Sequence, residues 1–480
     1  MALVQPQVSP QAASEADFMP QYKLGYVWAI SLIAAMGGLL FGYDWVVIGG
    51  AKPFFEPYFH ILTGTAQSGW ANSCALLGCL IGSMISGALS DRFGRKRLLL
   101  ASGLLFTGSS ILTGGASTFH IFVFWRICGG VAIGMASNLS PMYIAEVAPA
   151  AMRGRLVAVN QLAIVFGILA AQVSNLLIAR KMPDNATAEM IRLSWNGLQG
   201  WRWMFYAVAV PSVAFFALTL FVPESPRWLV KKGRDSLALR ILARIGGERY
   251  AAGEVGQIRA TLVGVESQRV RFGELLAPRV RRIIGIGVIL AVLQQWCGLN
   301  VIFNYGQEIF HDAGYGVSAT LFNIVITGAV TFVFSGVAIL MVEGLGRRLL
   351  ILSGCLGLVV THSLTGLSLF LHMKGLFVVV PVMASMASYA LSLAPITWVL
   401  ISEIFPNRIR GAAISVSVSA LWIACFILTY TFPLLYKTLG SASTFWVYAA
   451  ICLAGAVFIM LRVPETRGKT LEQIEHELVG

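Results

Sequence analysis

Charged residues are scarce in this sequence. Asp, Glu, Lys and Arg together make up 12% of its 480 residues, about half the share found in an average soluble domain. Hydrophobic residues make up 57% of the chain. Such a chain lacks the polar surface that a soluble protein needs, so the composition predicts a protein that crosses a membrane several times.

Patterns typical of several other classes are also missing. No nucleophile–base arrangement and no nucleotide-binding loop is visible, which argues against an enzyme or an ATP-driven pump. The six His residues are scattered, and the seven Cys residues fall inside apolar segments without a CxxC pair. We therefore expect no metal site, no cofactor and no disulfide. The start of the chain has no cationic segment followed by a short apolar core, so we expect no cleaved signal peptide.

Long apolar segments are what the sequence does contain. A membrane-spanning helix needs about 20 mostly apolar residues, and twelve segments satisfy this. They are 24–50, 66–90, 97–117, 119–145, 154–180, 201–222, 281–311, 317–341, 347–371, 375–405, 410–436 and 443–463. The predicted fold class is an all-α membrane protein with twelve transmembrane helices.

The basic residues follow a topological pattern. The net charge of +13 could suggest nucleic acid as a partner, but the Lys and Arg residues gather in alternate loops. With both termini in the cytoplasm, most of the 35 lie on the inner side, whereas Lys52 and Arg126 are among the exceptions. This bias predicts the orientation of the chain and contact with anionic lipid headgroups, without nucleic acid.

The two halves of the chain repeat short sequences in the same order. "AEVAPAAMRG" follows the fourth span and "SEIFPNRIRG" follows the tenth. "DRFGRK" corresponds in the same way to "EGLGRR", and "PESPRWL" to "PETRGKTL". Three matches at equivalent points of a six-span cycle indicate a duplicated unit. Parallel six-helix halves are typical of major facilitator transporters, whose substrate site lies between the halves.

A polar segment separates the two sets of six spans. In it, Leu237, Ile241 and Ile245 recur at four-residue spacing, which predicts short amphipathic helices on the cytoplasmic face. The expected organisation is a cytoplasmic tail (1–23), an N-terminal half (24–222), a cytoplasmic helical linker (223–280), a C-terminal half (281–463) and a cytoplasmic tail (464–480).

One acid lies inside a predicted span. Asp44, in "LLFGYDWVVIGG", would cost about 2.5–3.5 kcal/mol at the centre of an isolated membrane helix. Arg126, in the fourth span, lies at a similar depth in the outer half of the membrane, and glycines around both residues allow close approach. The pair could couple transport to protons, since a carboxylate titrates while a guanidinium stays charged. A static structural ion pair is the alternative.

Span seven contains four side-chain amides within eleven residues, Gln294, Gln295, Asn300 and Asn304. Amides both donate and accept hydrogen bonds, as sugar hydroxyls require. A helix break near Cys297 and Gly298 could bring all four to one cavity. The alternative is that they only join helices.

The motifs together resemble the sugar porter family of the major facilitator superfamily. They are "DRFGRKR", "PESPRWL", "QQWCGLNVIFNY", "EGLGRR", "SEIFPNRIRG" and "PETRGKTLEQIE", and the resemblance covers residues 24 to 475. "FGYDWVVIGG" and "NQLAIVFG" further resemble bacterial xylose–proton symporters and their glucose-transporter relatives.

The resemblance implies particular roles for residues. Asp44 matches the protonation site of proton-coupled members, whereas passive members tend to carry a neutral residue there. The matching sugar-binding positions are Gln161, Gln294, Gln295, Asn300 and Trp398, with Phe41 and Trp422 as aromatic positions near the ring. Asn304 replaces a frequent Tyr, while Ile168 and Leu421 are apolar where the xylose branch has amides, which leaves the monosaccharide open.

Charged residues of the repeated motifs fall at the inner ends of the spans. Opposite charges there could form a cytoplasmic gate that joins the halves when the site faces outward; the alternative is topology and lipid anchoring. The gate residues are Arg92, Arg95, Glu146, Arg153, Glu224, Glu343, Arg347, Glu403 and Arg410, with Glu465 nearby.

The expected function is a proton-coupled importer of a hexose or pentose that works by alternating access. The alternatives are a passive facilitator of the same fold and, ranked last because the tails are short, a non-transporting sugar sensor. We expect a monomer in the plasma membrane (the inner membrane in a bacterium). A glycosylation triplet begins at Asn185, on the predicted outer side.

Overall fold

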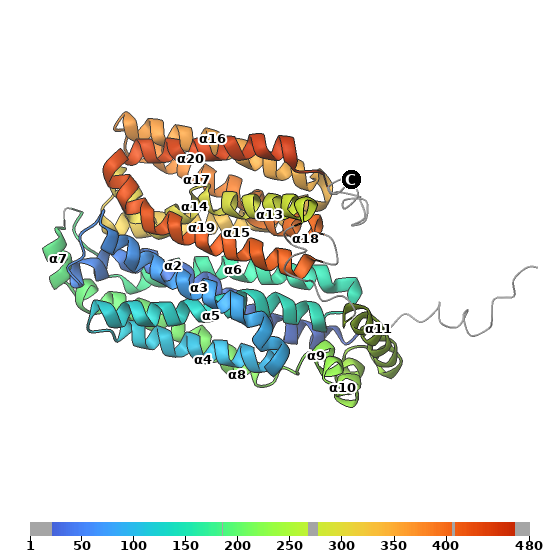
Figure 1. Cartoon of the computed structure of the whole chain (residues 1–480). Coiled ribbons are helices and arrows are strands. Elements are labelled where there is room, and N and C mark those ends of the chain that lie inside the picture. The colour runs from blue at the N-terminus through green and yellow to red at the C-terminus, as the bar shows by residue number, and fades with distance from the viewer. Residues whose placement is uncertain (1–21, 185, 267–276, 406–408, 466–480) are drawn as a thin grey trace, which may run out of the picture.

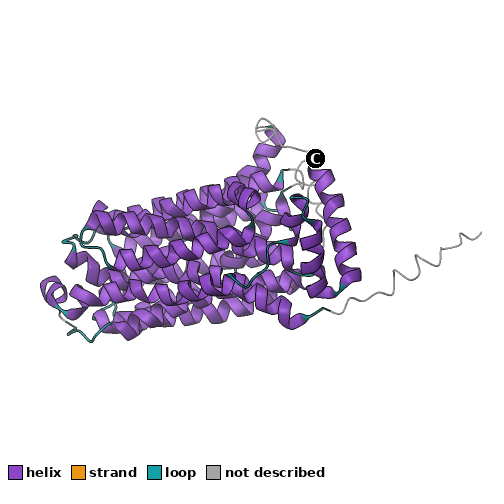
Figure 2. Cartoon of the chain, turned by 90° about the horizontal axis from the view of Figure 1, so that it is seen from below, coloured by secondary structure: helices purple, strands orange, loops and turns teal. Residues whose placement is uncertain are grey.

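The computed structural model describes residues 22–184, 186–266, 277–405 and 409–465. Twelve helices in these ranges are long and apolar enough to cross a membrane. The described ranges contain helices, turns and loops but no strand, and the long helices lie side by side in one bundle (Figures 1 and 2). The predicted fold class is confirmed. Asn185 and the terminal segments 1–21 and 466–480 lie outside the described residues.

The N-terminal half is built from six spans and shorter elements. In chain order these are α2 (Leu24–Tyr58), α3 (Ala66–Phe93), α4 (Arg95–Gly114), α5 (Phe119–Val147), a 3₁₀ turn (Ala150–Met152), α6 (Arg153–Ile178), α7 (Ala188–Leu193), a π-helical turn η2 (Asn196–Gly200) and α8 (Trp201–Thr219). Three helices follow them, α9 (Pro226–Lys231), α10 (Asp235–Gly246) and α11 (Glu248–Glu266).

The C-terminal half contains six spans, two of which are divided. Its helices are α13 (Pro278–Trp296), α14 (Leu299–Asp312), α15 (Val317–Leu345), α16 (Arg347–Phe370), α17 (Leu376–Leu391), α18 (Leu393–Ile404), α19 (Arg410–Leu439) and α20 (Ser441–Arg462). The seventh span is interrupted at Cys297 and at Gly298, which has φ +88°. The predicted break there is confirmed, whereas the break at Ser392 in the tenth span was not predicted.

The predicted end of the first span at residue 50 is wrong. α2 continues to Tyr58, with Pro53 and Pro57 inside the helix. Lys52, which lies beyond the predicted end of the span, and Glu56 are buried and form an i,i+4 ion pair within the helix. A charged residue can stay in a membrane span when a partner neutralises it, so this helix extends beyond the uncharged segment that precedes Lys52.

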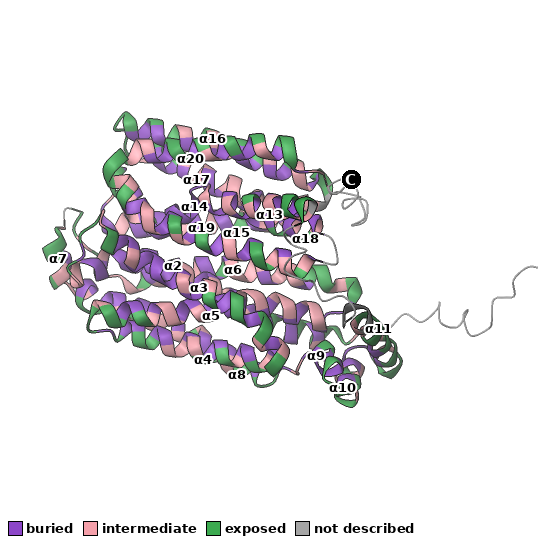
Figure 3. Ribbon diagram, in the orientation of Figure 1, coloured by how far each residue is buried: buried purple, intermediate pink, exposed green. Residues whose placement is uncertain are grey.

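The two halves lie one above the other in Figure 1, with the N-terminal half below. Helices α3 and α19, α6 and α15, and α2 and α14 make contacts between the halves. Exposed positions line the faces of the helices that point away from the bundle (Figure 3). Large apolar residues among them, such as Leu177, Val210 and Leu340, are 74–82% exposed, which suits contact with lipid chains.

Helices α9, α10 and α11, which follow the N-terminal half in the sequence, lie next to that half at one end of the bundle (Figure 1). The Trp228 indole donates to the carbonyl of Asp91 (3.0 Å), and the Lys23 amide donates to the carbonyl of Ile245 (2.8 Å). This is the end with the excess of basic residues, and we call it the inner end. The buried residues of α10 are Ala238, Leu242, Ile245 and Gly246. Of the apolar residues at four-residue spacing, Ile245 is thus buried, whereas Leu237 is 37% exposed.

Close packing of α2 against α6 depends on glycine. A Cβ atom at Gly42 would overlap the carbonyl oxygen of Ile164, and a Cβ at Gly167 would overlap that of Leu39. Both obstacles are backbone atoms, which cannot rotate away. Small residues in membrane helices allow this approach, and van der Waals packing then holds the helices together.

We predict that Gly42→Ala lowers the thermal unfolding temperature of the purified protein, since overpacking costs about 1–3 kcal/mol. The matched control is Gly87→Ala, because a Cβ at Gly87 in α3 meets nothing within 4 Å. Both substitutions carry the same helix-propensity gain of about 1 kcal/mol, so their difference isolates the clash. Equal unfolding temperatures for the two variants would contradict this packing argument.

Candidate functional site

Asp44 and Arg126 form a buried ion pair in the N-terminal half. The Arg126 guanidinium donates to Oδ1 of Asp44 at 2.8 Å, from α5 to α2. The two side chains are 5% and 3% exposed. Gly129 on α5 leaves room at this contact, since a Cβ there would lie 3.2 Å from Oδ2 of Asp44. The sequence placed both residues at similar depth, and the structure brings them together.

The pair is not fully saturated with hydrogen bonds. Oδ2 of Asp44 and Nε of Arg126 are buried without a hydrogen-bond partner in the described protein. The guanidinium also lies 5.4 Å from the centre of the Phe205 ring. The second carboxylate oxygen of Asp44 therefore has hydrogen-bonding capacity that the described protein does not use.

Three of the four amides of the seventh span form a chain across the helix break. Asn300 of α14 donates to Oε1 of Gln295, and Gln295 donates to Oε1 of Gln294 at 3.4 Å. Gln294 then donates to the carbonyl oxygens of Leu393 (3.2 Å) and Ala394 (3.1 Å), beside the break between α17 and α18. Gln294 thus joins two interrupted helices, as the alternative interpretation of the amides expects.

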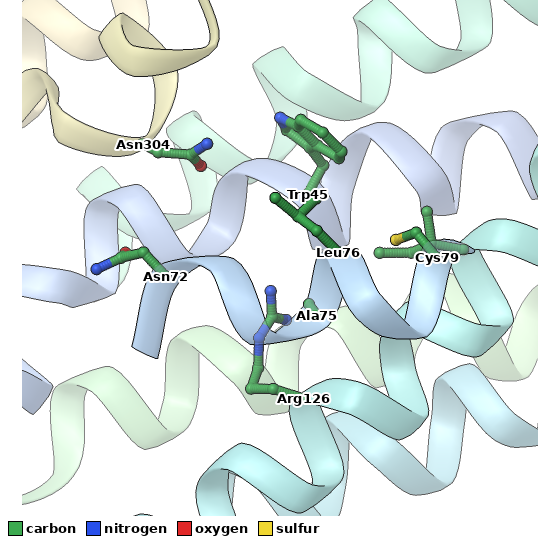
Figure 4. Close-up of a pocket in the computed structure, with 8 residues that line it drawn as sticks. Trp45, Asn72, Ala75, Leu76, Cys79, Arg126 and Asn304 are labelled. Carbon is green, nitrogen blue, oxygen red and sulfur yellow. The ribbon is translucent and has the colours of Figure 1, made fainter. Parts of the chain in front are cut away.

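Asn304 lies one helical turn beyond Asn300 and lines a small pocket with Trp45, Asn72 and Arg126 (Figure 4). That all four amides share one cavity stays a prediction. The remaining lining residues come from α3 and α5. They are Ala75, Leu76, Cys79 and Ile133. The pocket thus connects the C-terminal half to the Asp44–Arg126 pair.

Aromatic residues from both halves meet beside the amides. The ring centres of Phe41 on α2 and Trp422 on α19 are 6.0 Å apart. Trp422 is 3% exposed, and its indole N–H has no hydrogen-bond partner in the described protein. Trp398 on α18 is 39% exposed, and Gln161 on α6 is partly buried. The buried indole N–H and the amide chain supply polar groups next to apolar rings, a combination suited to a sugar.

The charged motifs at the inner ends form a network within the N-terminal half. Arg95 donates to Oε1 of Glu146 at 3.0 Å, and Glu146 accepts from the Ser225 hydroxyl. Glu224 accepts from the backbone amides of Arg95 (2.9 Å) and Lys96 (3.1 Å), at the first turn of α4. The carboxylate at a helix N-terminus also interacts favourably with the helix dipole.

The C-terminal half repeats this arrangement. Arg347 donates to Glu403 at 3.4 Å, and Glu465 accepts from the backbone amides of Arg347 and Arg348. The ion pairs Arg95–Glu146 and Arg347–Glu403 each join elements of one half. A latch between the halves stays a prediction.

Of the other predicted gate residues, Arg92 and Arg410 make local contacts. Arg92 is exposed and lies 5.1 Å from the centre of the Phe93 ring, and Arg153 is exposed at the start of α6. Arg410 donates to the carbonyl of Phe405 at 3.2 Å. Glu343 belongs to α15, but its side chain lies outside the described part of the structure. A role in a gate stays a prediction for all nine residues.

Sequence reasoning missed a charged cluster at the opposite, outer end. Lys52 is 2% exposed and forms ion pairs with Glu56 and with Glu308, which belongs to the other half. The sequence signal that could have revealed this cluster is the i,i+4 spacing of Lys52 and Glu56 directly after an apolar run. Trp45 was also missed, although it is a large aromatic residue beside Asp44. The described residues contain no group of three His, Cys, Asp or Glu that could hold a metal ion.

Comparisons with known proteins agree with this architecture. The family model "Sugar (and other) transporter" matches residues 30–478. The arabinose-proton symporter of Bacillus subtilis is 38% identical over 455 residues, 95% of this chain and 95% of that protein. The D-xylose-proton symporter of Escherichia coli K12 is 36% identical over 485 residues, with 95% and 96% covered.

A solved structure supports the same assignment. The xylose transporter XylE from E. coli in an inward-open conformation has a TM-score of 0.81 and 34% sequence identity, with 94% of this chain and 100% of that chain covered. The twelve spans, the two similar halves and the repeated charge networks agree with these matches, so this chain belongs to the sugar transporter family of the major facilitator superfamily.

Proposed function

We propose that this protein imports a hexose or pentose together with protons by alternating access. The observation that carries the proposal is the buried Asp44–Arg126 pair, whose second carboxylate oxygen has no hydrogen-bond partner. The curated relatives named as symporters of arabinose and xylose with protons support the same function for this chain. The sugar would bind between the halves, at Phe41, Gln161, Gln294, Gln295, Asn300, Asn304, Trp398 and Trp422.

Protonation of Asp44 would change the balance between conformations. The anion is stabilised by Arg126, whereas the neutral acid loses most of that attraction and needs less hydration. A group that differs in free energy between two protein conformations shifts their populations when it titrates. If protonation and sugar binding favour the same conformation, the proton gradient drives the sugar inward.

The energy of one proton is sufficient for accumulation. Moving one charge through 100 mV releases about 2.3 kcal/mol, and a tenfold concentration ratio requires about 1.4 kcal/mol. One proton per sugar would therefore sustain a ratio on the order of 50 from voltage alone, and a pH gradient would add to it.

A passive facilitator of the same fold is the second candidate, and the static-pair interpretation of Asp44 favours it. A non-transporting sensor ranks third.

The proposed location is the plasma membrane with both termini in the cytoplasm, in accord with the basic residues at the inner end. We propose that one chain is sufficient, because the site lies between the two halves of one protein. The charged residues of the predicted cytoplasmic gate would pair across the halves only in the outward-facing conformation.

We predict that Asp44→Asn abolishes uphill sugar uptake and leaves sugar exchange intact. In proteoliposomes with an interior-negative potential of 100 mV, the unaltered protein should accumulate sugar about 50-fold, and added sugar should make the outside alkaline. The variant should reach equal concentrations on both sides without a pH change. Radiolabelled sugar and a pH dye measure the two quantities.

The control for this experiment is Glu189→Gln, which removes an exposed carboxylate from α7 that pairs only locally with Arg192. It should accumulate sugar as the unaltered protein does. Full accumulation by Asp44→Asn would refute the assignment of the proton to Asp44, and pH-independent uptake by the unaltered protein would favour the facilitator.

A further inference from the structure

Trp45 completes an aromatic triangle between the two halves. Its ring centre lies 5.9 Å from that of Phe41 and 5.7 Å from that of Trp422. Phe41 and Trp45 occupy positions i and i+4 of α2, so they lie on one face of the helix, while Trp422 comes from α19 in the C-terminal half. The three rings therefore close a continuous apolar wall across the interface.

The position of Trp45 separates two polar regions. The amides Gln294, Gln295 and Asn300 lie around the helix break, whereas Trp45 itself lines the pocket that contains Asn304 and Arg126 (Figure 4). Since α2 runs from the inner to the outer end, Trp45 lies about 6 Å further out than Phe41. Trp45 thus lies on the outer side of the proposed sugar site, next to the rings of Phe41 and Trp422.

We propose that Trp45 is a specificity-determining residue that limits the size of the sugar. Its indole is rigid and large, so it can contact a bare pyranose or furanose ring but leaves no room for a bulky substituent on the outward side. A smaller side chain would open the site into the neighbouring pocket. This inference rests on the proposed sugar site and concerns which sugars it accepts.

The test compares parent sugars with bulky derivatives in the full-length protein. D-Xylose, L-arabinose, D-glucose and D-galactose are measured against their phenyl glycosides, by competition for uptake and by thermal stabilisation. The unaltered protein should bind its best sugar at least tenfold more tightly than the phenyl glycoside. Trp45→Ala should reduce this ratio to threefold or less, and Trp45→Phe should preserve most of it because an aromatic wall remains.

The matched control is Trp70→Ala. Trp70 is also partly buried and also contacts an aromatic residue of the other half, Phe426, at 6.3 Å between ring centres. It does not line the pocket, so its removal should leave the ratio unchanged. An unchanged ratio in Trp45→Ala overturns this inference, whereas failure of every sugar to bind the unaltered protein overturns the proposed function instead.

A second inference concerns the charge cluster at the outer end. The Lys52 ammonium lies 3.5 Å from Glu56, pairs with Glu308 of α14, and lies 5.0 Å from the centre of the Tyr305 ring. Glu56 also accepts a hydrogen bond of 2.5 Å from the Ser68 hydroxyl. The cluster therefore joins α2 and α3 of one half to α14 of the other.

The cluster lies beside a close backbone approach of the two halves. A Cβ atom at Gly49, one turn before Lys52, would overlap the carbonyl oxygen of Phe303 on α14. Lys52 is 2% exposed and Glu308 is 14% exposed. Separation of the halves at this end would expose both charges and break their pairing. At the inner end, by contrast, the ion pairs lie within the halves.

We infer that Lys52 and Glu308 are positioning residues that hold the outer mouth closed. Their attraction acts in a low-dielectric environment and is stronger than that of an exposed pair. Loss of Glu308 removes the attraction between the halves at this cluster, although Lys52 keeps its pair with Glu56. Loss of Lys52 leaves the carboxylates of Glu56 and Glu308 without their buried cation. Either change weakens the contact between the halves, so the outer mouth should open more often.

The experiment measures access to the pocket from outside. Cys79 lines that pocket and is fully buried in this conformation, so a membrane-impermeant maleimide should modify it slowly in right-side-out vesicles. Glu308→Gln should raise the rate of modification at Cys79 at least threefold, as measured by mass spectrometry. Lys52→Gln should act in the same direction. In the double variant the increase should be smaller than the product of the two single effects.

The control is Asp312→Asn, which removes a carboxylate four residues further along α14. Asp312 accepts a hydrogen bond from Tyr436 of its own half (2.6 Å), so its removal should not change the labelling rate. A wild-type rate in Glu308→Gln, with an unchanged unfolding temperature, overturns the inference. Multiplicative effects in the double variant would also contradict it, since they would mean that the two residues act independently.

Discussion

A charge inside a membrane protein must have a partner, and this constraint governs the architecture of the chain. Asp44 is retained in α2 because Arg126 reaches it from α5 at 2.8 Å. Lys52 is retained eight residues later because carboxylates from both halves surround it. In each case at least one partner comes from an element distant in sequence. Glycines on the helices permit the necessary approach of the backbones.

Interrupted helices serve the same requirement for polar groups. The break at Gly298 frees the carbonyl of Cys297, which lies 2.8 Å from Nε2 of the fully buried His362. Beside the break at Ser392, the carbonyls of Leu393 and Ala394 at the start of α18 accept from Gln294. Buried polar side chains thus bond to backbone groups beside each break. Irregular backbone at membrane depth is tolerated only under such conditions.

The two ends of the bundle differ in how their charges are paired. At the inner end, Arg95 pairs with Glu146 and Arg347 with Glu403, so each half carries its own network. At the outer end, Lys52 pairs with Glu308 across the halves. The outer pair thus links the two halves, whereas these two inner pairs do not.

Much of the fold could be predicted from the sequence, because membrane spans depend on local composition and length. The twelve helices, the all-α class and the break near Gly298 were predicted correctly, since apolar runs and glycine act locally. The end of α2 was wrong because local reasoning treats Lys52 as exposed, whereas Glu308, 256 residues away, neutralises it. That Asn304 lines a pocket with Trp45 and Arg126 could not be predicted either, because it depends on contacts between helices.

The sequence by itself therefore determined the spans, the duplicated halves and the residue types available for the site. Only the tertiary structure decided which charges pair, that Trp45 meets Trp422, and that the inner networks stay within the halves. The physical reason is the distance along the chain over which each property is determined. Hydrophobic segments insert according to their own composition, but an ion pair or an aromatic contact depends on distances between helices that are far apart along the chain.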